Sequence, residues 1–131
     1  MYRLNLVTPE KCIEPGTEVT EVTVPAYKGE LDILEGHAPT LTTLDTGVMT
    51  YKLAATGEVK KAVITWGFAR VGDGQIEVLA ETAESASQIN KERCKEAEKT
   101  ALAKLDSGEL DADGVQKYQM KLKRAQARLS I

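Results

Sequence analysis

The sequence changes character near residue 85, and this change constrains the fold more than any other feature. All four prolines and eight of the ten glycines precede that point, together with Trp66 and Phe68. The later residues contain no proline and are rich in Ala, Lys, Glu and Gln, which have good helix propensity. We therefore expect two domains, a β-strand domain over residues 1–84 and a helical domain over residues 85–131.

The first part alternates short apolar-polar segments with turn residues, a pattern typical of a compact β-sandwich or barrel. Thr56-Gly57 and Gly72-Asp73-Gly74 are the clearest hairpin turns, because glycine adopts positive φ angles easily. Val19 is out of step with the later valines of its segment, which indicates a β-bulge. The expected strands cover residues 2–7, 17–24, 48–53, 59–65, 68–71 and 75–79.

Two helices are expected after residue 85. Ser87 is a suitable N-cap for a helix that ends near Leu105, and Asp111 or Asp113 can cap a second helix. A connection of about eight residues predicts an antiparallel hairpin. The apolar stripe of the first helix is mostly alanine, and a buried methyl contributes only about 0.8 kcal/mol. Docking of the hairpin on another surface should therefore be reversible, although a fixed alanine-rich hairpin fits the composition equally well. The stripe consists of Ile89, Ala97, Ala101 and Leu105.

Charge is distributed unevenly along the chain. Residues 1–84 carry a net charge of −6 and residues 85–131 a net charge of +3. Residues 115–131 hold five basic side chains and no acidic one. A solvated face and a surface for an acidic protein partner both fit this strip. A nucleic-acid site fits poorly because the whole chain is acidic, and a membrane-surface helix would need larger apolar residues. The five are Lys117, Lys121, Lys123, Arg124 and Arg128.

The sequence offers no clear catalytic, metal or cofactor motif. Neither a phosphate-binding loop nor a dinucleotide-binding glycine pattern occurs. Cys12 and Cys94 are too few and too far apart for a disulfide framework or a zinc site. No apolar run approaches the roughly 20 residues that span a bilayer, and the N-terminus shows neither a signal nor a transit pattern. We expect a non-enzymatic, soluble chain that contacts membranes only through partners.

Residues 24–39 read VPAYKGELDILEGHAP, close to the pattern V-P-x-x-x-G-E-L-G-I-L-P-G-H-A-P. Asp32 and Glu35 stand where the pattern has glycine and proline. Further matches occur at Gly47-Val48, at Gly67-Phe68 and over residues 78–83. With these motifs and the strand-then-helix order, essentially the whole chain resembles the epsilon subunits of F-type ATP synthases.

The resemblance implies a flattened ten-stranded β-sandwich followed by a C-terminal antiparallel two-helix hairpin. It implies a non-catalytic central-stalk rotor subunit that anchors gamma to the c-ring and couples proton or sodium flow to ATP synthesis. The expected location is peripheral, on the cytoplasmic face of the bacterial inner membrane. Glu30 and Leu31 would meet the c-ring, and His37, Ala38 and Pro39 would lie near gamma.

The hairpin resembles the regulatory element of this family. In the extended state its basic second helix would meet an acidic segment of the catalytic head, formed by beta and alpha subunits, and block ATP hydrolysis. The carriers would be Lys117, Lys121, Lys123, Arg124 and Arg128, with the two arginines best suited to bidentate carboxylate contacts.

Some members of the family bind ATP through an Ile/Leu-Asp-x-x-Arg-Ala segment at the start of the first helix. Here Ile89 and Arg93 match, whereas Asn90 and Cys94 replace aspartate and alanine. We expect weak or absent ATP binding and no other cofactor.

Two other functions remain open at this point. One is a free-standing β-sandwich adaptor whose basic helix binds an acidic protein partner. The other is a small hydrolase or isomerase that uses His37 and Glu30. Copurification with an ATPase head separates the adaptor from the rotor subunit, and the turnover of variants lacking both side chains tests the enzyme.

Overall fold

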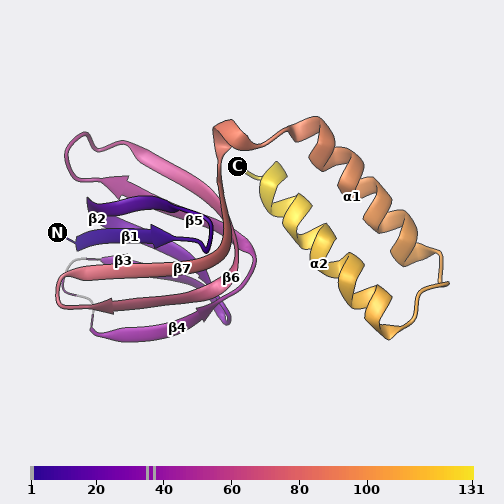
Figure 1. Ribbon diagram of the computed structural model, residues 1–131, viewed down its shortest axis with the longest axis horizontal. Coiled ribbons are helices and arrows are strands. Elements are labelled where there is room, and N and C mark those ends of the chain that lie inside the picture. The colour runs from indigo at the N-terminus through magenta and orange to yellow at the C-terminus, as the bar shows by residue number, and fades with distance from the viewer. Residues whose placement is uncertain (1, 35, 37) are drawn as a thin grey trace.

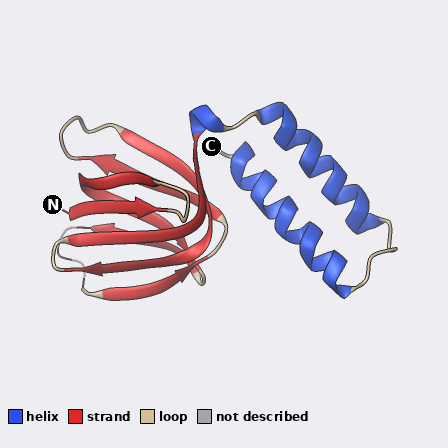
Figure 2. Cartoon of the chain, in the orientation of Figure 1, coloured by secondary structure: helices blue, strands red, loops and turns tan. Residues whose placement is uncertain are grey.

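The computed structural model describes residues 2–34, 36 and 38–131. Over these residues, seven strands are followed by a short 3₁₀ turn, η1, and two α-helices (Figures 1 and 2). The elements are β1 (Tyr2–Val7), β2 (Cys12–Ala26), β3 (Gly29–Leu34), β4 (Thr40–Leu44), β5 (Gly47–Leu53), β6 (Val59–Gly72), β7 (Gln75–Ser85), η1 (Ala86–Gln88), α1 (Lys91–Asp106) and α2 (Ala112–Leu129). The predicted class, a β-sandwich followed by a helical hairpin, is confirmed.

Two long strands connect the parts of the sandwich. The first half of β2 pairs with β1, and its second half pairs with β3 and β5. The first half of β6 pairs with β5 and its second half with β4, while β7 lies along its other side. β1 closes the arrangement by pairing in parallel with β7. The resemblance implied ten strands, and the described residues form seven, because β2 and β6 change neighbours without a break.

The expected separation of residues 59–65 from residues 68–71 is wrong. Both segments belong to β6, because Thr65 and Gly67 stay in one register with Thr82 and Ala80 of β7. Trp66, which lies between them, is half exposed, and the strict alternation of buried and exposed side chains is absent from Ala62 to Thr65. The expected bulge is confirmed, since the register of β2 against β5 shifts just after Val19.

The core lies inside the strands and is built from alternating side chains. Leu4 and Leu6 of β1 and Val22 and Val24 of β2 are fully buried, as their spacing predicts. The same cluster includes Val19, Ile33, Met49, Ile64, Ile76 and Val78. Every residue of this cluster precedes Glu84, so the sandwich has a core of its own.

The β6–β7 turn shows how local sequence directs the chain. Asp73 and Gly74 have φ angles of 52° and 71°, the paired positive values of the two-residue turn that suits twisted hairpins. Gly57 also has a positive φ, 72°, in the β5–β6 connection. Both predicted hairpin turns are confirmed.

The helices begin where a side chain caps them. Asn90 accepts a hydrogen bond from the backbone N–H of Arg93 at 3.2 Å, so the N-cap of α1 is Asn90 and the prediction of Ser87 is wrong. Ser87 lies in η1, where its hydroxyl bonds that of Ser85 at 3.0 Å. Asp111 caps α2 by accepting from the N–H of Gly114 at 2.7 Å, as predicted.

The hairpin packs through small side chains. Cys94 and Ala101 of α1 and Ala125 of α2 are buried, whereas Ala97, expected in the stripe, is exposed. Figure 1 shows α2 between the sandwich and α1, with α2 beside β5 and β6. The hairpin therefore adjoins one end of the sandwich through α2.

Candidate functional site

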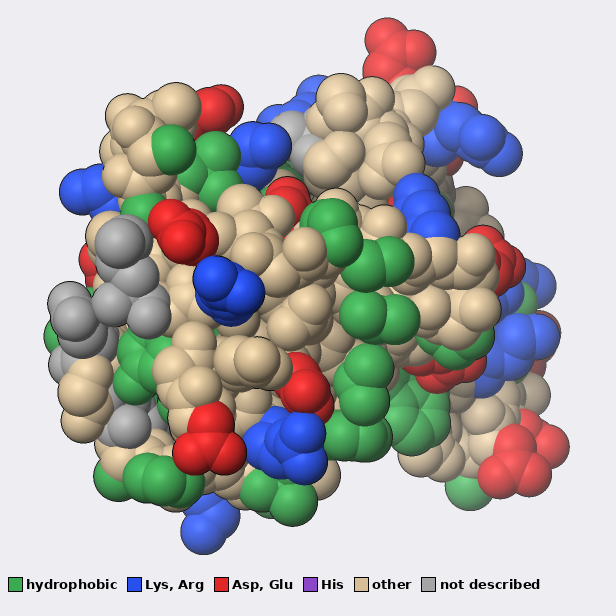
Figure 3. All heavy atoms as spheres, turned by 60° about the vertical axis from the view of Figure 1, so that its left-hand side comes forward, with side chains coloured by type: hydrophobic (Ala, Val, Ile, Leu, Met, Phe, Trp, Pro, Cys, Tyr) green, Lys and Arg blue, Asp and Glu red, His purple; other side chains and the backbone are tan. Residues whose placement is uncertain are grey.

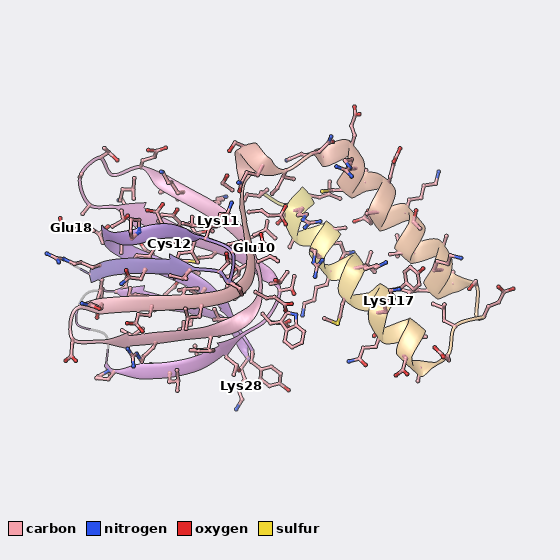
Figure 4. The ribbon with its side chains drawn as sticks, in the orientation of Figure 1. Glu10, Lys11, Cys12, Glu18, Lys28 and Lys117 are labelled. Carbon is pink, nitrogen blue, oxygen red and sulfur yellow. The ribbon has the colours of Figure 1, made fainter. Side chains whose placement is uncertain are left out.

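The Gly-Glu-Leu motif forms the start of β3. Gly29 has a φ of 123°, which favours glycine, and it ends the turn that joins β2 to β3. Glu30 is exposed, and Leu31 is half buried against the core. Lys28 in the same turn lies at the end of the sandwich nearer the hairpin (Figure 4). The Glu30 carboxylate is thus presented to solvent at the start of β3.

The residues predicted to lie near gamma follow the other end of β3. Ala38 and Pro39 are exposed, and the Ala38 carbonyl accepts a hydrogen bond from the Thr40 hydroxyl at 2.9 Å. His37 lies outside the described residues. From Glu30 to Leu34 the strand covers about 13 Å at ~3.3 Å per residue. The described parts of the motif therefore lie at opposite ends of β3.

Exposed apolar side chains that the sequence pattern did not predict lie on the outer face of β4, β6 and β7 and in the β2–β3 turn. Trp66 and Phe68 point outward at alternate positions of β6 and are 52% and 45% exposed. Leu79 lies directly opposite Phe68. Exposed apolar surfaces of this kind mark interaction sites on soluble proteins. The apolar patch consists of Tyr27, Leu41, Trp66, Phe68 and Leu79. The alternation of large Trp66 and Phe68 with small Gly67 and Ala69 was its only sequence signal.

The exposed surface combines apolar areas with scattered charges. Figure 3 shows hydrophobic side chains gathered in a band on one face. The apolar patch continues into a cleft of about 540 Å³ between the sandwich and α2. Tyr27 and Trp66 line it from the sandwich, and Gln116, Met120 and Lys123 line it from α2. The docked hairpin thus borders the apolar patch.

The five basic side chains of α2 have three different surroundings. Lys123 forms an ion pair with Asp45, and Arg128 forms one with Glu84, to which its Nε donates at 3.0 Å. The ammonium groups of Lys117 and Lys121 lie 6.0 and 5.1 Å from the centre of the Tyr118 ring. Among the described residues, the buried Nε of Arg124 has no hydrogen-bond partner. The five cations therefore do not share one environment in this docked state.

Asp45 lies in the β4–β5 turn and holds two donors. Its carboxylate accepts from Lys123 and from the backbone N–H of Thr46, the latter at 2.8 Å. The hydrogen bond from Lys123 is the main cause that lowers the pKa of Asp45 below its usual value. The charged form of Asp45 is therefore stabilised by the docked hairpin.

The residues considered for nucleotide binding line one groove. Ile89, Asn90 and Arg93 border a space of about 400 Å³ together with Glu84 and Arg128. The Asn90 side-chain oxygen is already used to cap α1. Glu84 neutralises Arg128 and would repel a triphosphate. The groove gathers the predicted residues, but it has little spare positive charge.

We expect the isolated chain to bind ATP with a dissociation constant of about 1 mM or higher. This value corresponds to a binding free energy near −4 kcal/mol. Isothermal calorimetry on the full chain measures this, and a micromolar dissociation constant would contradict it. The matched comparison is Asn90→Asp combined with Cys94→Ala, which restores the pattern of the ATP-binding relatives. This variant should bind ATP more tightly than the native chain.

Within the described part of the chain, no cluster of three or more His, Cys, Asp or Glu residues could hold a metal ion. No helix there is both long and apolar enough to cross a membrane. Both cysteines are free, Cys12 exposed and Cys94 buried. The prominent features of the described surface are thus the apolar patch, the motif around β3 and the cations of α2.

The sequence is similar to proteins of one family. The family described as "ATP synthase, Delta/Epsilon chain, beta-sandwich domain" matches residues 1–86. A protein of Bdellovibrio bacteriovorus named ATP synthase epsilon chain is 50% identical over 94 residues, covering 72% of this chain and 67% of its own length. Proteins of the same name from Geobacter metallireducens and Bacillus velezensis are 37% and 34% identical over 129 residues. These two alignments cover 98% of this chain and 91% and 95% of the relatives.

Two solved structures have the same fold. One is a chain in the cryo-EM structure of the Euglena gracilis mitochondrial ATP synthase, comprising OSCP, F1 and the c-ring in rotational state 1. It superposes with a TM-score of 0.87 at 25% identity, covering 98% of this chain and 79% of that one. The other, from the central stalk and c-ring of the Tetrahymena thermophila mitochondrial ATP synthase, has a TM-score of 0.64 at 14% identity, covering 98% and 94%.

Proposed function

Because the chain belongs to the ATP synthase delta/epsilon chain family, we propose that it is the epsilon subunit of a rotary ATP synthase. In this role it is a non-catalytic part of the central stalk, which anchors gamma to the c-ring and couples proton or sodium flow to ATP synthesis. The observation that carries the proposal is the extent of the similarity, which includes the sandwich and both helices.

The surfaces of the sandwich support two rotor contacts. The exposed Glu30 at the β2–β3 turn is suited to a polar loop of the c-ring, with Leu31 fixing the turn from below. The apolar patch is suited to gamma, because aromatic side chains dominate the centres of stable protein interfaces. His37, Ala38 and Pro39 are proposed at the gamma side on the family motif alone.

The cations of α2 support a regulatory role. When the hairpin extends, Lys117, Lys121, Lys123, Arg124 and Arg128 would meet acidic residues of the beta and alpha subunits and restrain ATP hydrolysis. Nucleic acid is not a proposed partner, since the chain is acidic overall. The chain would reach the cytoplasmic face of a bacterial inner membrane only as part of the complex.

We expect Trp66→Ala combined with Phe68→Ala to weaken binding to a gamma–c-ring complex by about 100-fold, because each truncation removes an interface contact that contributes more than about 1 kcal/mol. Surface plasmon resonance with a rotor complex stripped of this subunit measures the affinity. The matched control is Val59→Ala, because Val59 is 53% exposed in the same strand but outside the patch.

If the native chain binds the rotor complex and the double variant binds it with the same affinity, the apolar patch does not form the contact with gamma. Failure of the wild-type chain to bind any rotor complex would contradict the proposed function itself. The adaptor that binds an acidic partner through α2 would then be favoured.

A further inference from the structure

Few side chains of the docked hairpin are fully buried. Among the described residues of α2, Ala125 is the only one that is fully buried. Alanine offers one methyl group, the smallest apolar contribution of any non-glycine side chain. The sandwich and the hairpin carry opposite net charges, so electrostatic contacts are available to supplement this weak packing.

Two ion pairs connect α2 to separate places on the sandwich. Asp45, in the β4–β5 turn, binds Lys123, and Glu84, near the end of β7, binds Arg128. The Arg128 pair is about three-quarters buried on both sides, whereas the Lys123 pair is about half exposed. Lys123 and Arg128 are five residues apart, or about 7.5 Å along the helix axis. Two anchors at this separation restrict both the position and the rotation of α2.

Lys117 and Lys121 have no such anchor. No ion pair joins either side chain to any sandwich residue that the structure describes, and both are exposed beside Tyr118. Both precede Lys123 in α2 and lie farther along the helix from the Glu84 contact. Their charges are therefore available to a partner while the hairpin is still docked.

We propose that Asp45 and Glu84 form a latch that holds the hairpin down, and that the basic strip is divided between latch and capture. Lys123 and Arg128 engage the latch, while Lys117 and Lys121 make the first contact with an acidic partner. This inference deepens the regulation in the proposed function and rests on it for the identity of that partner. The opening of the latch, by contrast, involves only residues of this chain and does not depend on which partner it binds.

Because of this division, the latch residues and an acidic partner compete for the same cations of α2. Glu84 occupies the Nε–Nη2 edge of the Arg128 guanidinium, so this edge cannot form a bidentate pair with a carboxylate of the partner at the same time. The partner's apparent dissociation constant is therefore raised by the small fraction of molecules in which the latch is open. Weakening the latch should tighten binding of an acidic partner, although the substitutions lie outside the binding helix.

The test uses the full chain and a 20-residue polyglutamate peptide as the acidic probe, with affinity measured by calorimetry at low salt. Asp45→Asn with Glu84→Gln should bind the peptide at least fivefold more tightly than the native chain. Glu77→Gln with Glu81→Gln removes the same number of charges from β7 outside the latch and should change affinity less than twofold. Lys117→Gln with Lys121→Gln should weaken binding.

Hairpin position is read separately by electron spin resonance distances. One label is placed on exposed Cys12 and the other on α1 through Ala103→Cys, in a Cys94→Ala background. Adding the peptide should shift the latch variant to the undocked distance at a lower peptide concentration than the native chain. Asp45→Lys alone should favour the undocked distance. Adding Lys123→Asp re-forms an ion pair with reversed charges and should restore the docked distance of the native chain. The lysine pair variant should keep the native distance without peptide.

The inference is overturned if the latch variant and the charge-matched control gain the same affinity. It is also overturned if Lys117→Gln with Lys121→Gln undocks the hairpin as much as the latch variant does. Neither result affects the proposed rotor role, because that role is tested by binding of the sandwich to gamma and the c-ring.

Discussion

A chain that ends at residue 86 is expected to bind the rotor as well as the full chain and to leave ATP hydrolysis uninhibited. The sandwich core lies entirely before Glu84, so removal of α1 and α2 leaves its packing intact. Removal of residues 87–131 also takes away all five cations of α2. Rotor affinity should stay within about twofold of the native value, since all the proposed rotor contacts precede Glu84 in the sequence.

The measurement is the ATPase rate of the matching catalytic head, first stripped of this subunit and then titrated with each chain. The full chain should lower the rate to a plateau, and the shortened chain should bind without lowering it. A shortened chain that inhibits as strongly as the full one would show that the helices are not the brake. If the full chain binds and the ATPase rate stays unchanged, the protein couples the rotor but does not inhibit ATP hydrolysis.

Gly67→Ala is expected to destabilise the sandwich by more than about 3 kcal/mol, the upper part of the range for overpacked cores. A Cβ atom at this position would lie 1.8 Å from the carbonyl oxygen of Leu79 and 2.9 Å from Cα of Ala80. Both atoms belong to the backbone of β7, so a side-chain rotation cannot relieve the overlap. The β6–β7 ladder would have to separate beside the apolar patch.

Thermal and urea unfolding of the purified chain measure this loss. For a sandwich of this size, 3 kcal/mol corresponds to a fall in Tm of roughly 12–24 °C. Gly72→Ala in the same strand is the matched control, because nothing lies within 4 Å of its added Cβ and its φ is not in the left-handed region. A variant of Gly67 as stable as that of Gly72 would contradict the close approach of the two strands.

The sequence predicted most of the local structure correctly. The alternation of Leu4 and Leu6 placed β1, and Asp73-Gly74 placed a hairpin turn, because both depend on residues that are neighbours in the chain. Asp111 was identified as a cap for the same reason. The prediction of Ser87 as a cap failed because the chain makes a 3₁₀ turn before α1 begins, and Asn90 then offers the better-placed oxygen.

The site was only partly accessible to sequence reasoning. The motif around Glu30 and the cations of α2 could be named from residue patterns, and their roles stay predictions. The apolar patch could not be found in this way, because Tyr27 comes from the β2–β3 turn and Leu41 and Phe68 come from two separate strands. They form one surface only when β4 and β7 pair with β6.

By itself the sequence determined the strand-rich first part, the helical second part, the turns and the basic strip, since periodicity, φ preference and charge are local properties. The tertiary structure alone decided that β1 pairs with β7 and that the basic strip is divided. Asp45 and Lys123 are 78 residues apart, and Glu84 and Arg128 are 44 apart. Contacts between such distant residues depend on how the hairpin docks, and no local pattern contains that information.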